Sequence, residues 1–143
     1  MAVTMSIDNR GGTISKLTDR ERMDLARSSE TSIAELYYLA GDPNKYVRYY
    51  VADNPNTSLA ALRILSKDKD YHVRCRVADN HNITSDLLVE MADDKNKFVR
   101  EYVARNDKTP LGTLYHLTKD YEAGVSLAAQ ETINRVHKMM LRD

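Results

Sequence analysis

Pairs of valines four residues apart recur along the chain at a constant interval. The pairs are Val47 and Val51, Val73 and Val77, and Val99 and Val103, each 26 residues after the one before. Four-residue spacing places both side chains of a pair on one face of an α-helix. A fixed period of about 20–50 residues is typical of stacked structural repeats. The pattern therefore predicts an all-α solenoid of about four two-helix repeats.

Aspartates and asparagines at the same interval bound the first helix of each repeat. Asp42, Asp68, Asp94 and Asp120 precede the valines, whereas Asn54, Asn80 and Asn106 follow them. Aspartate is a favoured N-cap, and Pro43 suits the first helical position. Asparagine tolerates the left-handed conformation that ends many helices. We therefore predict a helix of about ten residues between the aspartate and the asparagine of each repeat.

Triplets of mostly apolar residues spaced three apart predict a second, shorter helix in each repeat. The triplets are Ile33, Leu36 and Leu39; Leu59, Leu62 and Leu65; Ser85, Leu88 and Met91; and Leu111, Leu114 and Leu117. This spacing suits a short α-helix or a 3₁₀ segment. Ser32 with Glu35 has the form of a capping box, and Thr109 before Pro110 has that of an N-cap followed by proline at N1.

The N-terminal residues lack this periodicity. Residues 1–17 are predicted to form a flexible arm, with binding to a partner or strand addition as an alternative role. Thr18 begins a capping-box sequence, at which the first helix is expected to start. Arg22, Leu25 and Ala26 lie 26 residues before Arg48, Val51 and Ala52, whereas Glu21 stands at the position of Val47. We therefore expect a degenerate terminal repeat here. Residues 18–143 are predicted to form a single repeat domain.

The C-terminal repeat departs from the pattern because no helix-breaking sequence follows its valine position. A single apolar stripe is formed by Val125, Ala129, Ile133, Val136 and Met140. This spacing predicts one long C-terminal helix whose stripe caps the open end of the core. The alternative is a homodimer contact, because Met139, Met140 and Leu141 provide more apolar surface than capping requires.

Composition narrows the classes of partner. Lys plus Arg equals Asp plus Glu at 21 each, so the chain has no overall basic field of the kind that drives non-specific nucleic-acid binding. Cys75 is the single cysteine, which excludes an internal disulfide and fits a reducing, cytoplasmic setting. No window approaches the roughly 18 apolar residues of a membrane span, and no signal-like run begins the chain, so no membrane partner is expected.

The sequence shows no arrangement typical of catalysis. His72, His81, His116 and His137 are scattered and form no ligand pair with neighbouring carboxylates, which argues against a zinc site. No glycine-rich phosphate loop, nucleophile elbow or pair of catalytic carboxylates is present. We therefore expect a protein that is not an enzyme and that has no catalytic residue, metal or cofactor.

The repeat has the form D-x5-V-R-x2-V-A-x-N followed by a leucine triplet. In one copy Asp42, Val47-Arg48, Val51-Ala52 and Asn54 carry it, followed by Leu59, Leu62 and Leu65. The pattern resembles the leucine-rich repeat variant family, a bacterial relative of the HEAT-like α-solenoids, over about residues 20 to 136. The resemblance implies a right-handed superhelix of paired short helices and a scaffold without chemistry of its own.

A row of arginines in register is the first candidate for partner binding. Arg22, Arg48, Arg74 and Arg100 recur at the repeat interval. Planar guanidinium groups suit carboxylates or phosphates of a partner. The alternative is a structural ladder in which each arginine pairs with one of the equally periodic aspartates.

The second candidate for partner binding is a set of neighbouring positions whose residues differ from repeat to repeat. In a repeat protein, such variable positions can determine which partner is bound. Lys45, Tyr49, Arg76 and Lys97 lie beside the arginine row. Tyr46 and Tyr50 flank the valine face and are interpreted as aromatic residues at the edge of the core. The predicted partner-binding set is Arg22, Lys45, Arg48, Tyr49, Arg74, Arg76, Lys97 and Arg100.

These features predict a non-enzymatic module that binds a protein partner through the first helices of its repeats. An acidic peptide or protein surface suits the arginine row. The second hypothesis is nucleic-acid binding through a basic concave groove, as in some HEAT-like proteins. Steep dependence of binding on salt concentration distinguishes the second from the first.

Overall fold

The computed structural model describes residues 13–142, and this part of the chain is all-α, as predicted. Its helices alternate between a nine-residue and a seven-residue type, and the chain ends in a long helix. Within each of two compact units, successive helices pack on one another as in a helical-repeat solenoid. The contacts divide the chain into two compact units, unit 1 at Met1–Asn82 and unit 2 at Ile83–Asp143.

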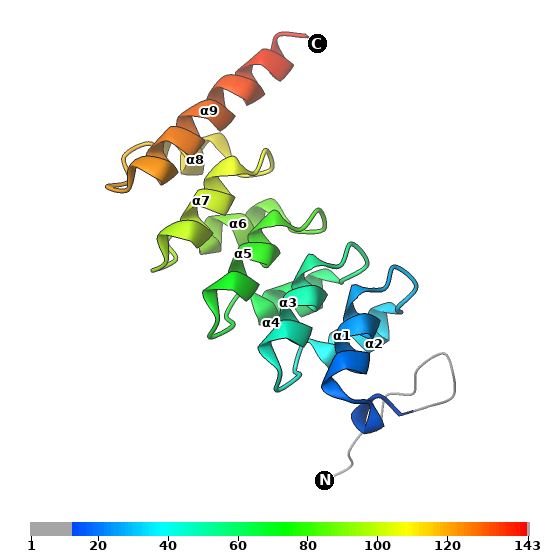
Figure 1. The fold of residues 1–143 in the computed structure, drawn as a ribbon. Coiled ribbons are helices and arrows are strands. Elements are labelled where there is room, and N and C mark those ends of the chain that lie inside the picture. Colours follow the sequence, from blue (N-terminus) through cyan, green and yellow to red (C-terminus); the bar gives the residue numbers. More distant parts are fainter. Residues whose placement is uncertain (1–12, 143) are drawn as a thin grey trace. The chain divides into compact units, whose positions relative to one another are not determined.

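Unit 1 contains two and a half repeats (Figure 1). After a 3₁₀ turn at Ile14–Lys16, its α-helices are α1 (Asp19–Arg27), α2 (Ile33–Leu39), α3 (Lys45–Asp53), α4 (Leu59–Leu65) and α5 (Tyr71–Asp79). The longer helices stack side by side, α1 on α3 and α3 on α5, while α2 packs on α4. The predicted arm lies mostly in residues 1–12, outside the described residues. Ile14 is fully buried, so the folded part begins before Thr18.

Unit 2 contains α6 (Ser85–Met91), α7 (Lys97–Arg105), α8 (Leu111–Leu117) and α9 (Ala123–Met140). The 18-residue α9 is the long C-terminal helix that the unbroken sequence predicts. It packs against both α7 and α8. Val125, Ala129 and Ile133 of its stripe are buried, whereas Met140 is exposed. The first part of the stripe therefore covers the core, and the predicted homodimer contact at its end stays a prediction.

The valine pairs form the core of the longer helices. Val47 and Val51 are fully buried in α3, as are Val99 and Val103 in α7. In the shorter helices, which are α-helical rather than 3₁₀, the second and third members of each apolar triplet are buried. The first member is not, and Ile33 is largely exposed. Helices this short are marginal alone in water, so their stability comes from this packing.

The prediction that Asp42, Asp68, Asp94 and Asp120 are N-caps is wrong, because each helix begins two residues later than that cap requires. The observed N-caps of α3, α5 and α7 are Asn44, Asp70 and Asn96, whose side chains accept from the N–H two residues on. Each predicted cap instead accepts from the N–H of the residue two positions later, as Asp42 does from Asn44 at 2.9 Å. This local turn leaves the other carboxylate oxygen available for a partner elsewhere in the fold.

Asn54 and Asn80 end α3 and α5 as predicted, but by a different mechanism. Both have extended backbone conformations rather than left-handed ones. The Asn54 amide donates to Ala26 O at 2.8 Å and Ser28 O at 2.9 Å in the preceding repeat. Asn80 donates to Ala52 O and Asn54 O in the same way. The asparagine is therefore a hydrogen-bonded tie between repeats.

The capping box of Ser32 and Glu35 is present in full at the start of α2. At α8, by contrast, Pro110 rather than Thr109 holds the N-cap position, and it makes no side-chain cap. Thr109 is buried, and its hydroxyl donates to Val103 O at 2.7 Å. The predicted cap is thus wrong because the threonine satisfies a carbonyl at the end of α7 instead.

Candidate partner-binding site

Arg22, Arg48 and Arg100 of the predicted row form two-point ion pairs with an aspartate of the next repeat. The Nε and Nη2 distances to the two carboxylate oxygens are 2.7 and 3.4 Å for Arg22 with Asp42, 2.7 and 3.3 Å for Arg48 with Asp68, and 2.8 and 3.3 Å for Arg100 with Asp120. These pairs form the Asp–Arg ladder that the sequence offers as the structural alternative. Fork-to-fork pairing of this kind fixes geometry as well as adding energy.

Arginines of the row also donate hydrogen bonds to backbone carbonyls. Nη1 of Arg48 donates to Asp42 O at 2.8 Å, and Nη1 of Arg74 donates to Asp68 O at 2.7 Å. Arg48, Arg74 and Arg100 are only 5–7% exposed. Little of each guanidinium reaches the surface, so these arginines stabilise the repeat and offer little surface to a partner.

The ion pairs shift the acidity of their members. The hydrogen bond to Asp42 raises the pKa of Arg22, and the one to Asp120 raises the pKa of Arg100. Burial alone would raise the pKa of Asp120, but hydrogen bonds from Arg100 and from the Glu122 N–H outweigh it and leave that pKa below its usual value. The Arg100–Asp120 pair is therefore charged at neutral pH.

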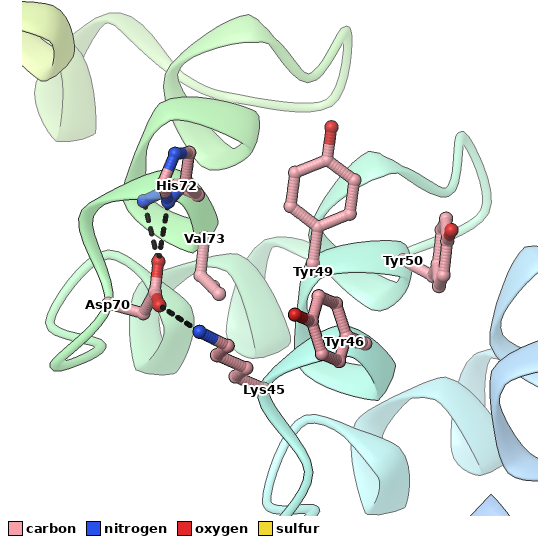
Figure 2. Close-up of a pocket in the computed structure, with 7 residues that line it drawn as sticks. All are labelled: Lys45, Tyr46, Tyr49, Tyr50, Asp70, His72 and Val73. Carbon is pink, nitrogen blue, oxygen red and sulfur yellow. Dashed lines mark hydrogen bonds and ion pairs between the residues drawn. The ribbon is translucent and has the colours of Figure 1, made fainter.

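Two further predicted residues of unit 1, Lys45 and Tyr49, line a pocket between α3 and the start of α5 (Figure 2). It has a volume of about 320 Å³ and is lined by Lys45, Tyr46, Tyr49, Tyr50, Asp70, His72 and Val73. The three tyrosines share a face because they follow the i, i+3, i+4 spacing of a helix. Tyr46 is 55% exposed, which corrects its interpretation as a residue at the edge of the core.

One wall of the pocket carries charge. Asp70 caps α5 through its Oδ1, which accepts from the His72 N–H at 2.8 Å and lies 3.2 Å from His72 Nδ1. Its Oδ2 lies 3.9 Å from Lys45 Nζ, a distance at the limit of an ion pair. Burial raises the pKa of Asp70, but these hydrogen bonds and the nearby cations lower it overall. Both carboxylate oxygens of Asp70 therefore already have partners within the protein, while the side chain of Lys45 is half exposed.

The other wall is aromatic and supported by arginines. The rings of Tyr49 and Tyr50 meet edge to face, with centroids 5.4 Å apart. Arg76, another predicted site residue, lies over Tyr49 with Cζ 5.8 Å from the centroid. Its Nη1 also lies 3.7 Å from Asp79. The structure therefore places Lys45 and Tyr49 in the lining of one pocket and Arg76 over the ring of Tyr49.

Lys97, the remaining predicted residue, belongs to a similar arrangement in unit 2. Its Nζ lies 5.3 Å from the centroid of Phe98 and 3.9 Å from Glu122 Oε2. Lys45 has the same two distances to Tyr46 and Asp70. The lysine, the exposed ring and the carboxylate thus recur two repeats later.

Sequence reasoning missed Tyr46, His72 and Asp70 as members of the site. The available signal was that Tyr46, His72 and Phe98 occupy one register position and all carry rings. Each stands immediately before a buried valine, at the second residue of its helix. His72 was considered only as a metal ligand, yet in residues 13–142 no group of three His, Cys, Asp or Glu side chains is arranged to hold a metal ion.

Of the helices formed by residues 13–142, none combines the length and apolar character that crossing a bilayer requires. No protein-family model matches the chain, and no curated protein is found similar to it.

Proposed function

We propose that this protein is a non-enzymatic interaction module that binds a protein partner on the α3–α5 surface of unit 1. The observation that carries the proposal is the pocket lined by Tyr46 and Tyr49 and bordered by Lys45. Tyrosine and arginine dominate the energetics of many interfaces, particularly where they surround a pocket. A volume of about 320 Å³ is at the lower end of ligand pockets, a size suited to an anchoring side chain.

The contrast between two sets of charges supports this location. Arg48 and Arg100 form short, buried ion pairs with aspartates, at 2.7 and 2.8 Å. The side chain of Lys45 is 54% exposed, and its Nζ lies 3.9 Å from Asp70. A partner can engage Lys45 without breaking a pair that stabilises the fold. Membership of the leucine-rich repeat variant family and a cytoplasmic setting are parts of the same proposal, supported by the repeat pattern and the single cysteine.

Nucleic-acid binding is the second candidate. The observation in its favour is that Tyr46 and Phe98 are exposed rings, each next to a lysine. Exposed rings beside cations suit the stacked bases and phosphates of a single strand. The equal numbers of acidic and basic residues count against it, because counterion release requires a surface with excess positive charge.

Affinity capture from the native host tests the first candidate. The full chain is immobilised as wild type, as Tyr46→Ala with Tyr49→Ala, and as Tyr37→Ala, and bound proteins are identified by mass spectrometry. Tyr37 is the matched control because it lies on α2, away from the pocket, and is 50% exposed. We expect a partner that is retained by wild type and Tyr37→Ala and lost from the double variant.

The opposite result would overturn the proposal: a partner held equally by all three proteins binds elsewhere. Retention that disappears on nuclease treatment, and that falls steeply with salt, would favour the second candidate instead. Thermal unfolding of each variant serves as the check that loss of binding does not reflect loss of folding.

A further inference from the structure

The three tyrosine rings of the pocket already have cations close to them. The distances from the cation to the ring centroid are 5.3 Å for Lys45 and Tyr46, 5.8 Å for Arg76 and Tyr49, and 5.0 Å for Arg27 and Tyr50. Cation–π attraction acts within about 6 Å of a ring centroid. A positively charged ligand that entered these rings would therefore meet like charges already in place.

The carboxylate that lines the pocket gives a cationic ligand no better partner. Asp70 is the single acid among the seven lining residues. Its Oδ1 accepts from the His72 N–H as the cap of α5, and its Oδ2 faces Lys45. A ligand ammonium would have to displace Lys45 and leave a second cation beside it. The pocket is thus unsuited to a lysine or a methylated lysine.

An acidic ligand meets the opposite conditions. Lys45 carries three donors on a flexible stem, is 54% exposed, and lies 3.9 Å from Asp70 Oδ2. The neighbouring His72 is also exposed, with a side chain 63% accessible. A carboxylate of the ligand can accept from Lys45 at the rim while an apolar side chain lies against Tyr46, Tyr49 and Val73.

We propose that the pocket binds an acidic peptide segment of the partner, with an apolar or aromatic side chain in the pocket and an adjacent Asp or Glu on Lys45. This inference rests on the proposed function and specifies its chemistry. Charge complementarity is its basis, because such groups set specificity more than raw affinity. The same lysine, ring and acid distances at Lys97, Phe98 and Glu122 indicate that the arrangement belongs to the repeat and is not an isolated coincidence.

Blocked synthetic pentapeptides test the proposal against the ¹⁵N-labelled full chain. The first has a central phenylalanine flanked on each side by two glutamates; the second replaces the glutamates by lysines; the third replaces the phenylalanine by alanine. A single-stranded oligothymidylate is the fourth probe. We expect the first peptide to shift the backbone amides of Lys45, Tyr46 and His72, the third to bind about fivefold more weakly or worse, and the second to cause no saturable shift there.

Two variants connect the effect to the lysine. Lys45→Met should weaken binding of the glutamate–phenylalanine peptide about two- to fivefold, the range for an exposed ion pair, and should remove most of its dependence on salt. Lys67→Met, which removes the same charge from an exposed position after α4, should leave binding unchanged.

Three results would overturn the proposal. The lysine peptide could bind as tightly as the acidic peptide or more tightly, or the oligonucleotide could cause saturable shifts of the same amides. The third is that the acidic peptide causes no saturable shift. The proposed function is tested separately by affinity capture. It is refuted when a captured partner binds the Tyr46→Ala, Tyr49→Ala double variant as well as it binds wild type. A partner lost from that double variant, combined with no binding of the acidic peptide, would refute the acidic chemistry alone.

Discussion

Arg48 in one repeat and Asp68 in the next are joined along one edge of the guanidinium, with Nε 2.7 Å from Oδ2 and Nη2 3.3 Å from Oδ1. The third nitrogen, Nη1, holds Asp42 O and Pro43 O. The two side chains are only 8% and 7% exposed. Each such pair therefore connects a helix to the loop that precedes the next repeat, within a largely desolvated environment.

Arg48→Met should consequently lower the free energy of unfolding by about 3–5 kcal/mol, because removing one partner of a buried pair leaves the other charge uncompensated. Chemical denaturation followed by circular dichroism measures the change. Lys45→Met on the same helix is the control: its ion pair is long and exposed, so its loss should change stability by about 1 kcal/mol or less. Similar stabilities of the two variants would contradict the assignment of Arg48 to the ladder.

Asn54→Ala should destabilise the protein by about 1–3 kcal/mol, since it leaves a buried carbonyl such as Ala26 O without its donor. Asn54 is 3% exposed, and its amide bridges two repeats. Asn56→Ala provides the comparison, because Asn56 donates to Ser29 O at an exposed position and water can replace it. Denaturant midpoints rank the two; an equal or larger effect at Asn56 would show that burial of the Asn54 tie is unimportant.

The sequence predicts the period because the same residue types recur at a constant interval. It predicts the buried valines and the long C-terminal helix because their apolar spacing is set within a few helical turns. The helix ends at Asn54 and Asn80 are also predicted, although the hydrogen bonds that these asparagines make to the preceding repeat are not. The sequence does not distinguish Asp42 from Asn44 as the N-cap, since both residue types accept from a backbone N–H. The decision is made by Arg22, which lies in the preceding repeat and takes the Asp42 carboxylate. Contacts of that range are invisible to local pattern.

The candidate site was predictable only in part for a related reason. Lys45, Tyr49 and Arg76 stand at positions that differ from repeat to repeat; Lys45 and Tyr49 line the pocket, and Arg76 lies over the Tyr49 ring. The exposure of Tyr46 depends on how α5 packs beside α3, which the spacing of one short helix does not determine. Burial of Arg48 likewise follows from the aspartate of the next repeat rather than from its own helix.

Acidification should weaken the fold through Asp120. Its pKa in the folded protein is lowered, with burial opposed by the stronger effect of the Arg100 and Glu122 hydrogen bonds. A depressed folded pKa means that the stabilisation is fully present above the unfolded value of about 4 and is lost as the pH falls below it. Asp120→Asn should therefore be less stable at pH 7 and show a smaller further loss between about pH 4 and pH 2.5. Denaturant titrations across this range measure both slopes, and parallel slopes would exclude Asp120 as a source of the acid sensitivity.

Replacing a large side chain by alanine should have different effects at the two ends of α9. Ile133 is 2% exposed in the core of unit 2, so Ile133→Ala should lower the free energy of unfolding by about 2–5 kcal/mol. Met140 is 59% exposed, so Met140→Ala in the monomer should change it by no more than about 0.5 kcal/mol. Unfolding at several protein concentrations, with sedimentation velocity, separates capping from the alternative homodimer. If Met140→Ala lowers stability only at high concentration and reduces the sedimentation coefficient, the exposed end of α9 is a dimer contact; if neither quantity responds, α9 acts as a cap alone.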